Sequence, residues 1–341
     1  MGMKMIDLRS DTVTKPSKAM QQAMSLAEVG DDVMGEDPTV NRLEEITAEL
    51  LGKEDALFVT SGTQGNLIST MVHCQRGEEY IAGTTSHLFH WEGGGVSVLG
   101  GIFPQPISFE KDGSLDLDKV KKMIKPDDDH FARTKLLALE NTQNGKVLPL
   151  GYFKKAALFA KEHKLAMHLD GARLFNAVVE SNVSPQEIAA QFDSVTFCLS
   201  KGLGAPVGSV ICANKEFIKE ARRLRKTLGG GMRQAGILAA AGLYALENNV
   251  KRLREDHENA ALLAQGLKGF GELEANTNMV FLQVGAHGRK LEEFLRAKGI
   301  MIWGGETLRL VTHLDIKRED IERVIGAFAE YYESFGRGLS S

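Results

Sequence analysis

Short continuous runs of apolar residues dominate the first part of this 341-residue sequence. They occupy residues 56–60, 136–140, 166–170, 194–200 and 209–212. A run of this kind predicts a strand that is buried on both faces. Between two of the runs, Phe153, Ala156 and Ala160 recur at the spacing of one helix face within residues 152–163. Because strands and helices alternate, we predict an α/β fold with a mostly parallel sheet and helices on both faces.

The last part of the sequence predicts a second, smaller domain. Residues 234–266 are rich in alanine and leucine, so we expect one long helix that links the two domains. Further strands and helices are expected at 278–284, 288–298, 307–313 and 317–333. The predicted organisation is an N-terminal arm at 1–30 that packs on the body, a large α/β domain at 31–240 and a small α+β domain at 241–341.

Composition excludes several classes of partner. The net charge of −4 gives no support to a nucleic-acid partner. No run approaches the ~18 apolar residues of a membrane span, and no signal peptide is visible at the N-terminus. The three cysteines, Cys74, Cys198 and Cys212, are scattered, and Cys198 and Cys212 lie in apolar runs that predict buried thiols rather than metal ligands. We therefore expect no metal site, no membrane partner and a cytoplasmic location.

Two strand ends suggest the chemistry. Asp170 ends the run at 166–170, and Lys201 directly follows the run at 194–200. Open α/β sheets bind ligands at the carboxyl ends of their strands. A lysine that forms a Schiff base and an aspartate that pairs with a pyridinium nitrogen are what pyridoxal 5′-phosphate (PLP) requires. Alternatively, Lys201 is a solvated lysine, and Asp170 is a helix cap or forms an ion pair with Arg173. If Asp170 instead faces the cofactor, Arg173 could support Asp170 or the substituents of the ring.

A phosphate anchor is predicted at Ser61-Gly62-Thr63, which follows one strand and precedes a helix. A helix N-terminus offers free N–H groups and a positive dipole end to an anion. The alternative is an ordinary helix cap. A second glycine run, Gly229 to Gly231, precedes Arg233, which could reach the phosphate across a subunit boundary.

Three further residues are candidates for substrate binding or proton transfer. Arg309 lies on the strand face opposite Leu308 and Leu310, where its guanidinium could clamp a carboxylate; the alternative is a surface arginine. His87 could stack on a cofactor ring or act as a base, and His130 is a second candidate base. Either histidine could equally be an ordinary loop residue.

Taken in order, these motifs resemble the low-specificity L-threonine aldolases, a family of fold-type I PLP enzymes. The resemblance covers nearly the whole chain. It includes Asp7-Leu8-Arg9-Ser10-Asp11-Thr12, Gly30-Asp31-Asp32-Val33, Ser61-Gly62-Thr63, residues 168–173, Ser200-Lys201-Gly202-Leu203, residues 229–234 and Arg309-Leu310-Val311-Thr312-His313. Three positions depart from the family pattern and concern the substrate pocket: Met34 and Trp91 stand where tyrosine is common, and Gln143 stands where histidine is usual.

The resemblance implies a role for each candidate residue. Lys201 holds PLP, Asp170 pairs with the ring nitrogen, Arg173 lies beside Asp170, Gly62 and Thr63 cradle the phosphate, His87 stacks on the ring, Arg233 reaches the phosphate from a neighbouring subunit, and Ser10 and Arg309 bind the substrate carboxylate. The resemblance also implies a homotetramer, a dimer of dimers, with sites completed at a dimer interface.

The expected activity is retro-aldol cleavage of L-threonine, L-allo-threonine and related β-hydroxy-α-amino acids to glycine and an aldehyde such as acetaldehyde. The base could be His87, His130 or a bound water. The alternative is a PLP-dependent β-eliminating lyase of the same fold. A nicotinamide site is set aside, because after Gly202 and Gly204 the next glycine is Gly208, one residue late for G-x-G-x-x-G, and a strand follows. A non-enzymatic scaffold is disfavoured because the Lys–Asp–Arg set is retained.

Overall fold

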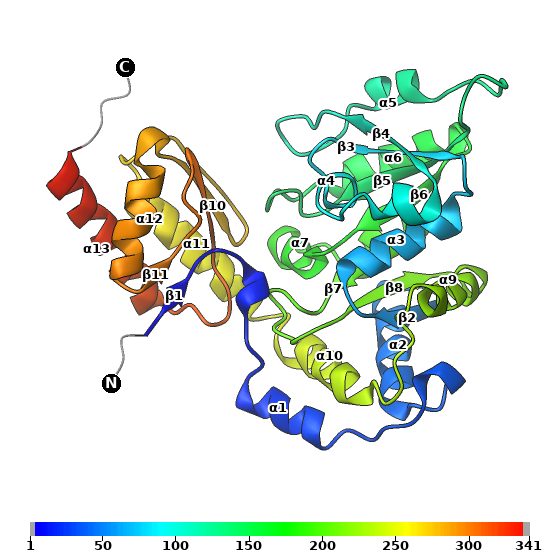
Figure 1. Ribbon diagram of the computed structural model, residues 1–341, viewed down its shortest axis with the longest axis horizontal. Coiled ribbons are helices and arrows are strands. Elements are labelled where there is room, and N and C mark those ends of the chain that lie inside the picture. The colour runs from blue at the N-terminus through cyan, green and yellow to red at the C-terminus, as the bar shows by residue number, and fades with distance from the viewer. Residues whose placement is uncertain (1–3, 337–341) are drawn as a thin grey trace.

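A seven-stranded sheet forms the centre of the larger part of the molecule in the computed structural model, which describes residues 4–336 (Figure 1). The strand order is β2-β8-β7-β6-β5-β3-β4. The strands are β2 (Asp55–Val59), β3 (Glu79–Gly83), β4 (Phe103–Ile107), β5 (Thr134–Glu140), β6 (Ala166–Asp170), β7 (Ser194–Cys198) and β8 (Ser209–Ala213). All neighbouring pairs from β7 to β4 are parallel, and β8 runs antiparallel to both of its neighbours. The predicted α/β fold with a mostly parallel sheet is confirmed.

Helices cover both faces of this sheet, which explains the continuous apolar runs. In β2, Leu57 and Val59 pack with α3 and α9, whereas Phe58 points to the other face and joins a core that includes α2 and α6. Because successive strand residues alternate between faces, both sets must be apolar when both faces are covered. The helices of this domain are α2 (Pro38–Leu51), α3 (Gly62–His73), α5 (Leu117–Met123), α6 (Leu150–Glu162), α7 (Leu174–Ser181), α8 (Pro185–Ala189) and α9 (Lys215–Thr227), with the short segments η2 (Asp32–Met34), α4 (His87–His90) and η3 (Val96–Gly100).

The β3–β4 end of the sheet was not expected from sequence, whereas β2 at the opposite edge was. The apolar pattern did not identify β3 and β4. Strand β4 contains Pro104 and Pro106 and lies at the sheet edge, where a residue without an N–H is tolerated. At the opposite edge, the N–H of Phe58 donates to Glu44 Oε1 (2.8 Å), and the Phe58 carbonyl accepts from Arg225 Nη1 (2.7 Å). Buried side chains therefore occupy backbone groups that an edge strand otherwise exposes.

The segment predicted as one linking helix is two helices. Helix α10 (Gly236–Asn248) contributes Ala239 and Ala241 to the large-domain core. Helix α11 (Leu253–Leu267) contributes Leu263 and Leu267 to a second core. The turn between them carries the chain from one core to the other, and the boundary predicted at 240/241 falls inside α10.

The second core belongs to the smaller part of the molecule, on the left of Figure 1. Its three-stranded antiparallel sheet has the order β12-β10-β9, and a two-stranded parallel sheet pairs β1 with β11. The elements are β1 (Ile6–Asp7), β9 (Leu273–Asn276), β10 (Met279–Gln283), η4 (Gly285–His287), α12 (Gly288–Ala297), β11 (Ile300–Met301), β12 (Thr307–Val311) and α13 (Arg318–Phe335).

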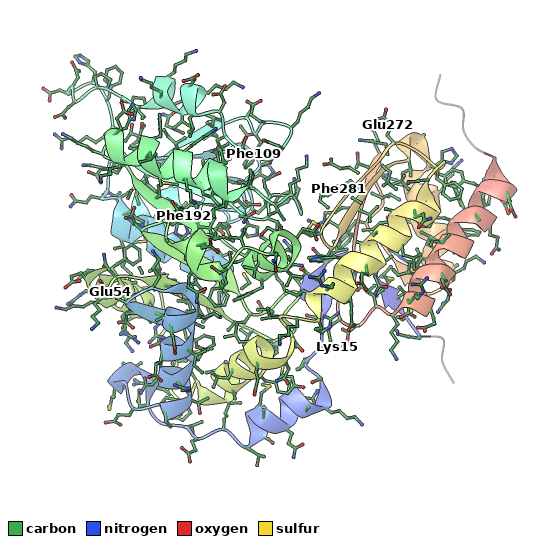
Figure 2. The ribbon with its side chains drawn as sticks, turned by 180° about the vertical axis from the view of Figure 1, so that it is seen from behind. Lys15, Glu54, Phe109, Phe192, Glu272 and Phe281 are labelled. Carbon is green, nitrogen blue, oxygen red and sulfur yellow. The ribbon has the colours of Figure 1, made fainter. Side chains whose placement is uncertain are left out.

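The N-terminal arm connects both parts rather than packing on the large domain alone. Ile6 and Leu8 are buried in the small-domain core, and β1 pairs with β11 (Figure 1). After η1 (Asp11–Val13), helix α1 (Lys18–Ser25) places Met20 in the large-domain core. Lys15, between these two segments, lies at the junction in Figure 2. Residues 1–3 of the predicted arm and 337–341 of the predicted small domain lie outside the described range. No helix within residues 4–336 is long and apolar enough to cross a membrane.

Candidate active site

The carboxyl ends of the parallel strands bring several predicted residues to one edge of the large sheet. Strand β6 ends at Asp170, and Lys201 follows the end of β7. Strand β2 runs parallel to β7, because both are antiparallel to β8, so Gly62 also lies at this edge. His87 follows β3 there. The topology thus gathers residues that are far apart in sequence, as expected for a doubly wound sheet.

Asp170 is a buried carboxylate with two hydrogen-bond donors. Its Oδ2 accepts from Asn66 Nδ2 (2.7 Å), and its Oδ1 accepts from the N–H of Ala172 (3.0 Å). Its side chain is only 4% exposed. Hydrogen bonds to a buried carboxylate stabilise its ionised form, so Asp170 is suited to face a cation.

Arg173 pairs with Asp11 of the N-terminal arm, so the alternative Asp170–Arg173 ion pair does not form. Its Nε and Nη2 donate to the two carboxylate oxygens of Asp11 at 2.7 and 2.6 Å. Burial acts to raise the pKa of Asp11, but the charges of Arg173 and Lys201 and the hydrogen bonds from Arg173 lower it to about 2. This two-pronged ion pair fixes the arm against the strand edge.

Lys201 has a fixed backbone and an uncommitted side chain. Its carbonyl accepts from Thr14 Oγ1 (3.1 Å) and from the N–H of Gly204 (2.8 Å), whose φ of +79° favours glycine. Its Nζ makes no hydrogen bond or ion pair with any residue in the described range. The positive charge nevertheless lowers the pKa of Asp11 and opposes the rise in the pKa of Glu140. The amine is therefore available to a ligand.

The N-terminus of α3 combines a helix cap with free backbone donors. Ser61 Oγ accepts from the N–H of Gln64 (3.1 Å), so Ser61 is the cap. The N–H groups of Gly62 and Thr63 have no acceptor within residues 4–336, as expected for the first turn of a helix. A Cβ added at Gly62 would lie 2.8 Å from Cys198 Sγ, which explains why a glycine stands there. The cap and the anion site are thus compatible.

His87, Glu92 and Glu140 form a second group beside Asp170. His87 Nδ1 lies 2.8 Å from Glu92 Oε1, and the His87 N–H donates to Glu140 Oε2 (2.8 Å). The hydrogen bond to Glu92 raises the pKa of His87 despite partial burial. Burial, followed by the charge of Asp170, raises the pKa of Glu140 to about 7. We did not single out these acids or Asn66 from sequence, although Glu140 ends an apolar run just as Asp170 does.

The predicted carboxylate clamp lies next to the Asp11–Arg173 pair. Arg309 Nη2 donates to the carbonyl of Arg9 (3.2 Å). Burial and the nearby charge of Arg173 lower the pKa of Arg309, so a bound anion would stabilise the charged form of its guanidinium. Ser10 Oγ accepts from the N–H of Thr12 (3.2 Å) and caps η1. Arg309 thus contacts the residue that precedes Ser10, and their shared role in carboxylate binding stays a prediction.

Two predicted residues are not gathered at this edge within one chain. His130 precedes β5 and so lies at the amino end of that strand, where its side chain is 86% exposed and contacts Asp128. The Arg233 side chain is 55% exposed, and its Nη1 pairs with Asp31 (2.9 Å). The glycine run before Arg233 does approach α3, because a Cβ at Gly230 would lie 2.3 Å from the Gln64 side chain.

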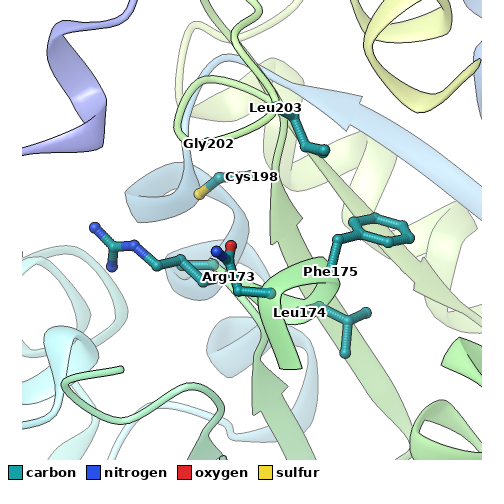
Figure 3. Close-up of a pocket in the computed structure, with 8 residues that line it drawn as sticks. Arg173, Leu174, Phe175, Cys198, Gly202 and Leu203 are labelled. Atoms are coloured by element: carbon teal, nitrogen blue, oxygen red, sulfur yellow. The ribbon is translucent and has the colours of Figure 1, made fainter. Parts of the chain in front are cut away.

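A small cavity lies beneath these groups (Figure 3). It measures about 10 Å³, and Arg173, Cys198 and Gly202 are among the residues that line it. That volume suits about one water molecule. The cavity by itself therefore identifies no site for a cofactor or an amino acid.

Known proteins match the chain over most of its length. A family model described as beta-eliminating lyase matches residues 7–286. The low specificity L-threonine aldolase of Escherichia coli (strain K12) is 57% identical over 94% of this chain and 97% of its own. The solved threonine aldolase of Leishmania major is 22% identical with a TM-score of 0.84, covering 96% and 99% of the two chains. A chain solved as SPT with PLP has a TM-score of 0.74 at 19% identity and covers 97% and 88%. At these identities the two structures support the fold alone.

Proposed function

The chain belongs to the beta-eliminating lyase family and, within it, to the low-specificity L-threonine aldolases; we propose on that premise that it cleaves β-hydroxy-α-amino acids. The proposed substrates are L-threonine and L-allo-threonine. The products are glycine and an aldehyde, which is acetaldehyde for these two substrates. The reaction breaks the Cα–Cβ bond, moves the hydroxyl proton to a base and adds a proton at Cα.

The residues at the strand edge fit PLP. Lys201 would hold the cofactor covalently, and Asp170 would pair with its ring nitrogen. The free N–H groups of Gly62 and Thr63, and the close approach that Gly62 permits, suit a phosphate. Arg173 would lie beside the ring, and His87 would stack on it. Arg233 of a neighbouring subunit would add a charge to the phosphate.

Within this arrangement the protein's own groups would orient the substrate and move its protons. Bound PLP would supply an electron sink for the negative charge that develops at Cα. Arg309 and Ser10 would hold the substrate carboxylate and so fix which bond at Cα is cleaved. Since His87 Nδ1 faces the Glu92 carboxylate, it carries the proton in the neutral ring and Nε2 is free to accept one. We propose His87 Nε2 as the base for the β-hydroxyl; His130 of another subunit and a bound water are the alternatives.

The observation that carries this proposal is the uncommitted Lys201 amine at the same sheet edge as buried Asp170. In the protein loaded with PLP, Lys201→Ala is expected to abolish both the visible absorbance of the bound cofactor and glycine formation. Lys53→Ala is a matched control, because Lys53 is also partly buried and its Nζ donates to Phe192 away from this edge. Retention of both signals in Lys201→Ala contradicts the proposal.

β-Elimination is the second candidate because the matching family model is described as beta-eliminating lyase. It would release ammonia and a keto acid such as pyruvate rather than glycine and an aldehyde. The same reactions, assayed for all four products on L-serine, L-threonine and L-allo-threonine, distinguish the two. Ammonia and a keto acid without aldehyde would favour elimination, the keto acid being pyruvate from L-serine and 2-oxobutanoate from the two threonines.

We further propose a homotetramer with shared sites, located in the cytoplasm. The exposed Arg233 side chain and the exposed apolar residues Met34, Trp91, Val98 and Leu99 support contacts between subunits. Three buried, free thiols are consistent with a reducing compartment. Light scattering tests the assembly. Mixing inactive Lys201→Ala with Arg233→Ala subunits tests sharing, because a mixed dimer with shared sites regains one intact site.

A further inference from the structure

A line of buried polar side chains runs from Asp170 into the large domain. Asn66 of α3 is 1% exposed, and its Nδ2 donates to Asp170 Oδ2 (2.7 Å) and to Glu92 Oε1 (2.9 Å). Its Oδ1 lies 3.1 Å from His168 Nε2. A single amide thus connects two acids of the site with a histidine behind them.

The line continues through one hydroxyl. His168 Nδ1 lies 2.8 Å from Ser194 Oγ, and His73 Nε2 lies 2.7 Å from the same oxygen. Burial lowers the pKa of His168 to about 3 and that of His73 to about 4, so both rings are neutral near pH 7. The groups behind Asn66 therefore carry no charge.

The protons in this line have one consistent arrangement. The oxygens of Asp170 and Glu92 that face Asn66 accept, so the Asn66 amide nitrogen must face them and its oxygen must face His168. His168 Nε2 then carries the proton, and its Nδ1 accepts from the Ser194 hydroxyl. The Ser194 oxygen in turn accepts from the Nε2–H of His73. The two acids thereby determine which way the Asn66 amide points, and the amide oxygen determines which nitrogen of His168 carries the proton.

We infer that Asn66 is a positioning residue, whose amide oxygen accepts a hydrogen bond from His168, that holds the Asp170 and Glu92 carboxylates at a fixed separation and thereby orients His87. One ligand atom each from His87, Glu92 and Asp170 lies within 4.8 Å of the other two, so a small movement of the amide affects all three. The inference deepens the proposed function and rests on it, since Asp170 would face the ring nitrogen and His87 would act on the substrate.

The first test uses the protein without cofactor and histidine-selective ¹⁵N NMR. In the parent, His168 is expected to remain the neutral Nε2–H tautomer from pH 5 to 9. In Asn66→Leu the Glu92 carboxylate loses a donor that favours its charged form, and it accepts a proton more easily. His87, which Glu92, Asp170, Glu140 and Lys201 surround, then loses an anionic partner. Its pKa should fall by about one unit.

Two further variants separate positioning from packing. Ser194→Ala is a smaller change that removes the donor to His168 Nδ1, so the Nδ1 signal should move while His168 keeps its proton on Nε2, because the Asn66 oxygen still accepts from it. Ser69→Ala is the matched control, because its hydroxyl is buried on the same helix and has no hydrogen-bond partner in the described range. It should leave the signals of both histidines unchanged.

With PLP bound, the pH at which the visible absorbance changes should shift by about one unit in Asn66→Leu and not in Ser69→Ala. Unchanged His87 and His168 signals in Asn66→Leu overturn the inference. If that variant does not fold, the appearance of the second His168 tautomer in Ser194→Ala overturns it instead. A parent protein that forms no glycine would refute the proposed function while leaving the NMR result intact, so the two failures are distinguishable.

Discussion

The ion pair between Asp11 and Arg173 is expected to stabilise the junction between the N-terminal arm and the strand edge. Asp11→Asn keeps the size of the side chain and removes its charge. The pKa of Asp11 falls from 3.8 to about 2 in the folded protein. At 1.36 kcal/mol per unit, this lowering corresponds to about 2 kcal/mol of stability. Because the native pKa is depressed, that stability is present above pH ~4 and is lost as the pH falls towards 2.

Asp11→Asn should cost more than this figure, because it leaves the Arg173 charge buried without a partner. Removing one member of a buried pair costs about 3–5 kcal/mol. Urea unfolding at pH 7 measures the loss as a shift of the midpoint at constant slope. The deficit of the variant should remain constant from pH 7 to 5 and shrink between pH 4 and 3.

Two comparisons test this explanation. Glu45→Gln makes the same chemical change in the ion pair with Arg42, where both side chains are mostly exposed, and should cost less than about 1 kcal/mol. The double variant Asp11→Asn/Arg173→Met should be more stable than the sum of its single changes implies. A loss in Asp11→Asn no larger than that in Glu45→Gln, or simple additivity in the double variant, would refute the reasoning.

Three further outcomes are expected. Gly62→Ala should weaken PLP binding about tenfold, measured by absorbance titration, because its Cβ would meet Cys198 Sγ; adding Cys198→Ala should restore binding, and no recovery contradicts the steric cause. Arg309→Gln should raise KM for the amino acid about a hundredfold without changing the cofactor spectrum. Arg309→Lys should give a KM between those of the parent and of Arg309→Gln, and an unchanged KM would show that Arg309 does not bind the substrate. Without cofactor, Glu140→Gln should stabilise the protein more at pH 8 than at pH 5, as measured by thermal unfolding. The pKa of Glu140 is raised to about 7 in the folded protein, so its ionised form destabilises the fold above that pH. Equal stabilisation at both pH values would contradict this direction of pH dependence.

The strand-end chemistry could be predicted because it depends on local pattern and simple topology. Asp170 and Lys201 each follow an apolar run, and parallel strands bring such ends to one edge. Strand β4 could not be recognised in the same way, because its prolines are tolerated only at a sheet edge and the sequence does not reveal which strand lies there.

The partners of the charged groups were harder to predict than their positions. Asp170 is three residues from Arg173 and was the obvious partner, yet the arginine pairs with Asp11, which only tertiary folding brings near. Asn66 lies inside a helix, where an asparagine predicts nothing about the acids it will meet. The prediction of a single linking helix at 234–266 was wrong for a similar reason. The chain turns between α10 and α11 because the two helices pack in two separate cores.

The pairing of β1 with β11 has a consequence for how the protein is made. Ile6 and Leu8 are synthesised long before their partner strand at Ile300–Met301, which lies far along the same chain. A contact that closes nearly the whole chain forms slowly, because the entropy of closing that loop must be overcome first. The large domain can begin to fold during synthesis, whereas the small-domain core must wait until Ile300–Met301 has been made. During that interval the apolar residues Ile6 and Leu8 lack their native partners and are exposed to aggregation.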